Sequence, residues 1–154
     1  MNIQSHKTIL GFSLPELIII LMVIAILAVI ALPSYQEQLR KSRRVDAVVA
    51  LIDLANRLER NYSELNAYPQ NAAEVAAFLP TTAANSPQGY YQLSFQGIGT
   101  ASTATTFKIQ ATRISTGLQA NDNTCGDYTL TDQGVRAITG TGTLAQCWPG
   151  GGPN

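Results

Sequence analysis

Histidine is almost missing from this sequence, and its single copy, His6, lies within the first ten residues. Without a histidine in the main part of the chain, neither a Ser-His-Asp triad nor a Cys-His pair can form, and the usual zinc ligand sets cannot be assembled. No glycine-rich phosphate-binding loop follows an expected strand. The sequence therefore argues against an enzyme, and we expect no catalytic residues, no metal site and no cofactor.

Charge is also scarce. Charged residues make up 13% of the 154 residues, and 10 basic residues balance 10 acidic ones, whereas an ordinary domain has about a quarter of its residues charged. This neutrality argues against a nucleic-acid-binding protein that relies on bulk positive charge. The length fits one domain of ordinary size.

Only two cysteines are present, Cys125 and Cys147. Their separation is far too wide for a CxxC redox or zinc pair. In an oxidising compartment they would form one disulfide around a loop of about 20 residues, which would stabilise the fold by roughly 3 kcal/mol. The alternative is a pair of unrelated buried thiols in a cytosolic protein.

One long apolar run, Phe12 to Leu32, contains a single charged residue, Glu16, near its start. As a helix this run would span roughly 30 Å, the thickness of the hydrocarbon core of a bilayer. It continues into Pro33 and a charged helical sequence instead of a small-residue cleavage site, so we expect a retained anchor rather than a secretory signal peptide. Pro33 is expected to kink the helix without ending it.

The segment 34–63 has the pattern of an amphipathic helix that continues the anchor. We expect one stripe to face the head of the protein: Val45, Val48 or Val49, Ile52, Ala55, Leu58 or Glu59, and Tyr62. We expect the opposite, charged face to lie in solvent: Arg43, Arg44, Asp46, Asp53, Arg57 and Arg60.

The remaining chain predicts a small antiparallel sheet. Four prolines and glycines punctuate 66–91 as a loop with a short helix at 72–78. Alternation predicts strands at 90–95 and 105–113 and a hairpin over 127–138 that turns at Asp132–Gly134. We expect Tyr90 or Tyr91 in the core and Trp148 over the disulfide. The fold class is α+β: a long kinked N-terminal helix, transmembrane in its first half, packed on a small antiparallel β-sheet.

The stretch "GFSLPEL", from Gly11 to Leu17, follows a short polar leader and opens the apolar run. It resembles the prepilin signature of type IV pilins and their pseudopilin relatives. The segments "SYQEQLRKSRRVDAVVAL" and "SPQGYY" and the "C…CW" ending are most similar to PilE-like minor pilins. The resemblance implies a leader at 1–11, a transmembrane and assembly helix at 12–33, and a periplasmic head at 34–154, with helix 34–63, linking loop 64–89, and sheet plus disulfide-bounded loop at 90–154.

The resemblance also implies processing and partners. A prepilin peptidase would cut after Gly11, where its site requires a residue without a side chain, and would methylate the new amino group of Phe12 from S-adenosylmethionine. Pro15 departs from the apolar residue that is commonest at its position, but proline suits a first helical turn. The implied partners are this peptidase and N-methyltransferase, other pilin subunits, and the inner-membrane pilus assembly machinery.

Glu16 has two interpretations. A carboxylate in hydrocarbon costs several kcal/mol unless it is neutralised or paired, and the ammonium of Phe12, in the same or a neighbouring subunit, would supply the opposite charge during assembly. Alternatively, the positive end of the helix dipole favours a carboxylate in the first turn, and Glu16 lies at headgroup level. The resemblance favours the docking role.

A basic cluster conflicts with the expected orientation. Arg40, Lys41, Arg43 and Arg44 follow the anchor, and the positive-inside rule would place them in the cytoplasm. The peptidase site and the two cysteines instead place the N-terminus in the cytoplasm and the head in the periplasm. We therefore expect the chain to be anchored in the inner membrane before assembly and to be part of a surface pilus afterwards. The cluster is then a solvated helix face, or meets acidic neighbours or anionic headgroups.

The expected function is that of a minor pilin, a structural subunit that supports pilus biogenesis, adhesion, twitching motility or DNA uptake. The alternatives are a pseudopilin of a type II secretion system, and a pilus-tip adhesin or DNA-binding minor pilin, although the sequence has no basic patch with interleaved aromatic residues. A calcium loop at Asp122, Asp127 and Asp132 is a weaker alternative, because their spacing is too wide.

Overall fold

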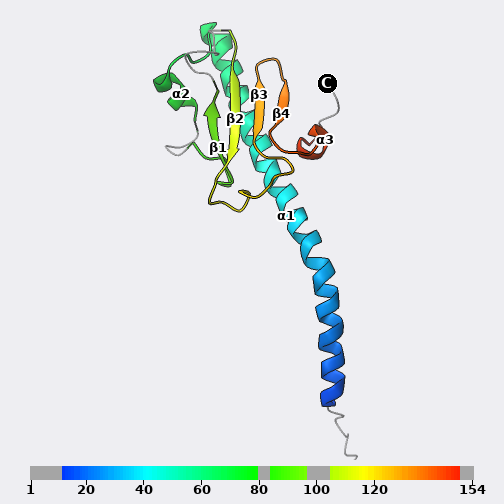
Figure 1. Ribbon diagram of the computed structural model, residues 1–154. Helices are drawn as coiled ribbons and strands as arrows, with labels where there is room; N and C mark the ends of the chain where they lie inside the picture. Colours follow the sequence, from blue (N-terminus) through cyan, green and yellow to red (C-terminus); the bar gives the residue numbers. More distant parts are fainter. Residues whose placement is uncertain (1–11, 80–83, 97–104, 150–154) are drawn as a thin grey trace, which may run out of the picture. The chain divides into compact units, whose positions relative to one another are not determined.

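The computed structural model describes residues 12–79, 84–96 and 105–149, so Gly11 lies outside the described residues. Its elements, in chain order, are α1 (Leu14–Leu65), α2 (Ala72–Phe78), β1 (Tyr91–Phe95), β2 (Lys108–Arg113), β3 (Tyr128–Thr131), β4 (Arg136–Ile138) and α3 (Leu144–Cys147) (Figure 1). The chain divides into two compact units, Met1–Gln38 and Leu39–Asn154. The predicted α+β class is confirmed.

The described part of the first unit is the first half of α1. Its best 18-residue window has a mean hydropathy of 3.1, and none of that window is buried. The helix is therefore long and apolar enough to cross a membrane. Pro33 lies inside α1 and does not end it.

The second unit contains a four-stranded antiparallel sheet with strand order β1-β2-β3-β4. Alternate residues of the strands, among them Tyr91, Leu93, Ile109 and Tyr128, point into the core. The second half of α1 runs along one face of this sheet (Figure 1). The core between them also includes Ala47, Leu51, Leu54 and Leu58 of α1. Gly134, with φ of 74°, lies in the predicted hairpin turn between β3 and β4.

The face of α1 that enters this core matches the predicted stripe only in part: Val48 and Leu58 are buried, and Ala55 and Tyr62 pack against the core, but other members of the stripe are exposed. Val45, Val49 and Ile52 are 42%, 51% and 44% exposed. Besides Val48 and Leu58, the buried face includes Ala47, Leu51 and Leu54, all at most 2% exposed. The centre of the buried face is therefore rotated from the centre of the predicted stripe, toward Ala47, Leu51 and Leu54.

The same rotation buries two charged residues that were expected in solvent. Arg44 is 3% exposed and Asp46 is 5% exposed. The Asp46 carboxylate accepts hydrogen bonds from the Ser86 hydroxyl and from the backbone N–H of Gln88 at 3.0 Å. Buried charges persist when they are paired or hydrogen-bonded, and these contacts tie the 86–90 loop to α1.

Both edges of the sheet are protected. The segment 84–86 lies along the outer edge of β1, where Leu93 N–H donates to the carbonyl of Ala84 at 2.6 Å and Ser86 N–H donates to the carbonyl of Tyr91 at 2.8 Å. At the opposite edge, β4 has only three residues and is followed by α3. A capping box between Thr143 and Gln146 begins α3.

Candidate functional site

The amino end of α1 carries the predicted processing and docking residues. Of the cleavage pair, only Phe12 is described, and it is 76% exposed. The carboxylate of Glu16 lies in the first turn of α1 and accepts from the Ser13 N–H at 3.5 Å, the long limit of a hydrogen bond. This position in the first turn is compatible with both interpretations of Glu16. The structure leaves Phe12 and Glu16 exposed, so both remain accessible to another molecule.

The anchor presents an apolar surface that is uninterrupted from Leu17 to Leu32. Its large apolar side chains from Leu14 to Leu32 are all exposed, and the least exposed of them, Ile20, still reaches 44%. Exposed apolar surface on this scale marks a site for lipid or for other apolar helices. Val45, Val49 and Ile52 lie further along the same helix at spacings of four and three residues, so apolar surface is also exposed on α1 within the second unit.

The disulfide lies at the other end of the sequence. Cys125 and Cys147 are bonded, with their Cα atoms 5.6 Å apart, which is the ordinary separation for a disulfide. The predicted disulfide is thus present. Trp148 is 1% exposed, belongs to the same core cluster as both cysteines, and packs edge-on against Tyr128 with ring centroids 5.7 Å apart.

A buried polar cluster joins the disulfide region to α1. Two guanidinium nitrogens of Arg44, Nε and Nη2, donate to the Asp122 carboxylate at 2.6 and 2.8 Å. Beside them the Gln119 amide donates to the Tyr91 hydroxyl at 3.2 Å and to Asp122 at 3.3 Å. Cys125 N–H reaches the same carboxylate at 3.5 Å. The cluster therefore holds the loop that precedes Cys125 against helix α1.

The ionisation of this cluster follows from its contacts. Burial raises the pKa of Asp122, but the hydrogen bonds and the charge of Arg44, with backbone N–H groups of Cys125 and Thr124, outweigh burial and leave the pKa below its usual value. Burial raises the pKa of Tyr91 to about 12, with the Gln119 hydrogen bond opposing this change. At neutral pH the cluster holds one carboxylate, one guanidinium and neutral tyrosines, which is a structural rather than a reactive arrangement.

Two of the three aspartates of the weaker calcium alternative contact arginines instead. Asp122 pairs with Arg44, and Asp127 pairs with Arg113 at 3.1 Å. Within 12–79, 84–96 and 105–149, no three His, Cys, Asp or Glu side chains gather as metal ligands would. A groove of about 600 Å³ lies between the end of α1 and α2, and its one carboxylate, Glu74, accepts from Gln70 N–H and the Asn71 amide at the start of α2.

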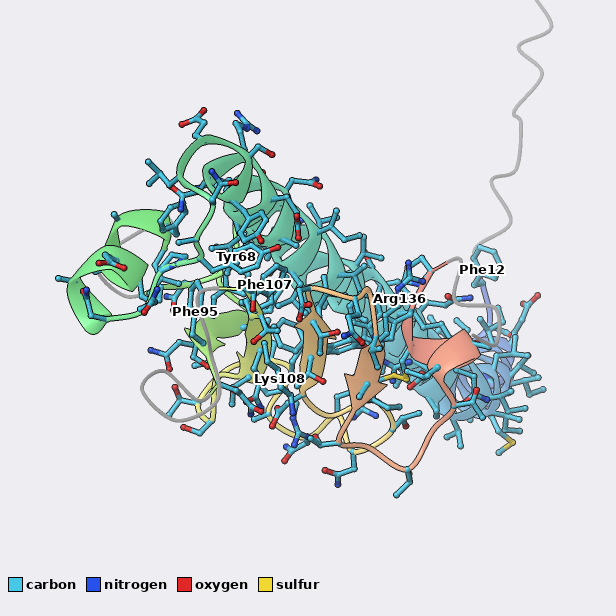
Figure 2. The ribbon with its side chains drawn as sticks, turned by 90° about the horizontal axis from the view of Figure 1, so that it is seen from above. Phe12, Tyr68, Phe95, Phe107, Lys108 and Arg136 are labelled. Atoms are coloured by element: carbon cyan, nitrogen blue, oxygen red, sulfur yellow. A yellow bond between two sulfur atoms is a disulfide. The ribbon has the colours of Figure 1, made fainter. Side chains whose placement is uncertain are left out.

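Several basic side chains of the head contact other groups of the head. Arg113 donates to Asp127 and to the carbonyl of Asp122, and the guanidinium of Arg136 lies 5.4 Å from the centroid of the Trp148 ring. Lys108 is exposed on the side of the sheet away from α1 (Figure 2). Residues 40–44 bring four basic side chains together, and Arg44 among them is buried.

The sequence did not predict the buried contacts of Arg44 with Asp122 or those of Asp46 with the 86–90 loop. One signal for Arg44 was present: it shares the spacing of Ala47, Leu51, Leu54 and Leu58, so a helix in that phase would bury it. No sequence signal identified Asp122 as its partner, because 77 residues separate the two.

A family model described as type IV minor pilin ComP, DNA uptake sequence receptor, matches residues 33–129. A type IV pilin from Shewanella oneidensis of known structure is 28% identical over 71% of this chain and 97% of its own, with a TM-score of 0.48. The non-core minor pilin PilV of Neisseria meningitidis is 22% identical over 69% of this chain and 92% of its own, with a TM-score of 0.44. No curated protein matches the chain.

Proposed function

The chain belongs to the family of the type IV minor pilin ComP, and from this premise we propose that it is processed at Gly11/Phe12 and enters a pilus through α1. As a minor type IV pilin it is a membrane-anchored subunit that assembles with other pilins. The observation that carries the assembly proposal is the apolar surface of α1, of which none is buried over its most apolar 18 residues. Such a surface requires lipid before assembly and neighbouring helices afterwards.

The processing step rests on the residues around the junction. Gly11 is followed by Phe12, whose exposed position leaves its backbone within reach of a peptidase and a methyltransferase. Mass spectrometry of the membrane-extracted chain should show the loss of Met1–Gly11 and the gain of one methyl group. An intact amino terminus, or cleavage elsewhere, would contradict the proposal. A Gly11→Leu variant should accumulate as the uncleaved precursor.

Glu16 is proposed as the docking charge. Once Phe12 is the amino terminus, its ammonium is the nearest opposite charge in sequence, and attraction in a low dielectric would set the axial position of an incoming subunit. Desolvation offsets much of the Coulomb energy, so the pair contributes more to register than to affinity.

The decisive variant is Glu16→Gln. Its amide oxygen can still accept from the Ser13 N–H, so the helix start is kept while the charge is lost. The docking role predicts that Glu16→Gln is cleaved normally but is strongly depleted from sheared pili, as is Glu16→Ala. Glu64→Ala, an exposed acidic residue at the other end of α1, is the control. If Glu16→Gln enters pili like the wild type, capping alone explains this residue.

The proposed topology places the N-terminus in the cytoplasm and the head in the periplasm of a single-pass inner-membrane precursor. The disulfide supports this proposal, because such bonds persist in oxidising compartments. The prepilin peptidase and the pilus assembly machinery are its proposed partners there. When cells are denatured in the presence of a thiol-alkylating reagent and without reductant, Cys125 and Cys147 should stay unlabelled, whereas labelling of both would place the head in a reducing compartment.

A second candidate function is DNA uptake, which the description of the family favours. If the chain binds DNA, its affinity should fall steeply with salt and should differ between an uptake sequence and a scrambled duplex. Binding of the full chain in detergent to both duplexes, measured at several salt concentrations, tests this. Equal, undetectable binding to both would leave only the structural role.

A further inference from the structure

Four of the basic residues lie within five positions, from Arg40 to Arg44, and Arg40 follows Leu32 by only eight residues. Such a cluster next to a membrane span usually marks the cytoplasmic side, so its presence beside a periplasmic head calls for another reason. Pilus assembly through the apolar face of α1 does not supply one.

The structure divides the cluster by function. Arg44 faces inward and holds Asp122. Lys41 is exposed, Arg40 and Arg43 are half-buried, and the guanidinium of Arg43 lies 5.5 Å from the centroid of the Tyr90 ring. Three cations therefore remain at the surface around one turn of α1.

An exposed leucine is held beside these cations. The Arg43 guanidinium donates to the carbonyl of Leu118 at 3.5 Å, and the Gln119 amide donates to the carbonyl of Arg40 at 3.3 Å. Together with the Arg44–Asp122 pair, these contacts fix the 118–122 loop against residues 40–44. The side chain of Leu118 is 68% exposed, although the loop that carries it is well anchored.

We propose that Arg40, Lys41, Arg43 and Leu118 form a surface that binds the headgroups of anionic phospholipids while the subunit resides in the membrane. Eight residues of helix span about 12 Å, which brings arginine and lysine side chains within reach of the phosphate layer and within a Debye length of its charge. Cations beside an exposed aliphatic side chain are the composition of interfacial membrane-binding surfaces.

Charge and position favour lipid over nucleic acid as the occupant. Both carry phosphates, but this surface adjoins the apolar run in sequence, where phospholipid is always at hand. In a membrane, the Leu118 side chain could contact acyl chains just below the headgroups. The phosphate backbone of a DNA duplex has no comparable apolar surface next to its phosphates. The inference requires only that α1 is anchored in a membrane, and so it stands apart from the proposed DNA uptake.

The test uses the full chain in detergent micelles, titrated with phosphatidylglycerol or with phosphatidylcholine and followed by native mass spectrometry. The wild type should bind phosphatidylglycerol preferentially, and higher ionic strength should weaken this preference. The variant Lys41→Gln/Arg43→Gln should bind it roughly 25-fold more weakly, about fivefold for each removed charge. The matched control, Arg57→Gln/Arg60→Gln, removes two exposed cations further along α1 and should bind like the wild type.

Equal loss in both double variants, or in neither, overturns the proposal. Because Arg43 also contacts Tyr90 and Leu118, the single variant Lys41→Gln, whose side chain is exposed, provides the second measurement and should show about a fivefold loss. A Lys41→Gln chain that binds phosphatidylglycerol normally but DNA more weakly would identify the surface as a nucleic-acid contact instead.

Discussion

At the scale of single residues, the head depends on charges placed where a small core would normally exclude them. Arg44 and Asp122 are almost completely buried and satisfy each other through two hydrogen bonds. A buried pair of this kind adds little net stability over an apolar pair, but loss of one partner leaves the other charge buried alone. The pair therefore determines where the 118–122 loop docks more than how stable the head is.

Arg44→Met should destabilise the head by roughly 3–5 kcal/mol, because Asp122 loses its cation. Arg44→Met/Asp122→Leu should recover most of this loss. Arg57→Met breaks a pair whose side chains are 44% and 57% exposed and should cost at most about 1 kcal/mol. Chemical unfolding of the detergent-solubilised chain, followed by Trp148 fluorescence, gives these values. A double variant as unstable as Arg44→Met would contradict this account.

Acid should unfold the head partly through Asp122. Its pKa in the folded chain is lower than in the unfolded chain, so the carboxylate stabilises the fold above the unfolded value, about 4, and this contribution is lost as the pH falls through the folded value. The Arg44→Met/Asp122→Leu chain should lose less free energy of unfolding than the wild type between neutral and strongly acidic pH. Parallel losses in the two chains would assign the acid sensitivity to other carboxylates.

At the scale of elements, the sequence predicted most boundaries and failed on the rotation of one helix. The short helix at 72–78, the strands, the hairpin turn and the continuation of α1 through Pro33 all follow local signals of periodicity, proline and glycine. The exact rotation of α1 does not, because Val45, Val49 and Ile52 form an apolar stripe next to the buried one that holds Val48 and the leucines. Only the sheet decides between them.

Two substitutions test this rotation. Leu51→Ala removes a side chain that is 0% exposed and should cost roughly 2–5 kcal/mol of stability. Val49→Ala should leave stability within about 0.5 kcal/mol, as expected for an exposed position, yet reduce the amount of subunit in sheared pili. Thermal unfolding and shearing yields give the two readouts. The reverse pattern would mean that α1 packs in the phase that the sequence pattern predicted.

Alanine substitutions at two glycines with positive φ allow the cost of backbone strain to be distinguished from the cost of steric crowding. Gly126 (φ 67°) lies where an added Cβ would come within 2.7 Å of the Gly140 nitrogen, whereas Gly134 (φ 74°) faces open space. Gly134→Ala should cost about 1–2 kcal/mol from backbone strain alone. Gly126→Ala should cost roughly 1–3 kcal/mol more, because the strands near the disulfide must shift. Similar unfolding midpoints for the two variants would refute this difference.

At the scale of the whole molecule, the head has a hydrophobic core of its own, whereas the most apolar 18 residues of the anchor are not buried at all. The docking and processing roles proposed for Gly11, Phe12 and Glu16 rest on resemblance, because the peptidase and the neighbouring subunits that these roles require are other molecules. The Arg44–Asp122 pair could not be inferred at all, since it joins segments that only the folded head brings together. Local sequence patterns thus predict helices and strands, but they do not predict ion pairs between residues that are far apart in the sequence.

Membrane anchoring should depend on the middle of the apolar run. Ile24→Asp places a carboxylate there at a cost of roughly 2.5–3.5 kcal/mol, so part of the chain should move from the membrane pellet to the alkaline-wash supernatant. Val45→Asp, an exposed position in the head, introduces the same charge and should remain in the pellet. If both variants partition alike, the run does not act as the anchor.

The protected sheet edges have a consequence for crowding along a fibre. Segment 84–86 occupies the outer hydrogen-bonding groups of β1, and β4 offers only three residues at the other side. Neighbouring heads held at very high local concentration therefore have no long unpaired strand through which to merge by strand addition. Lateral order must then come from side chains, which lets the displayed surface vary in sequence without making the fibre prone to amyloid-like fusion.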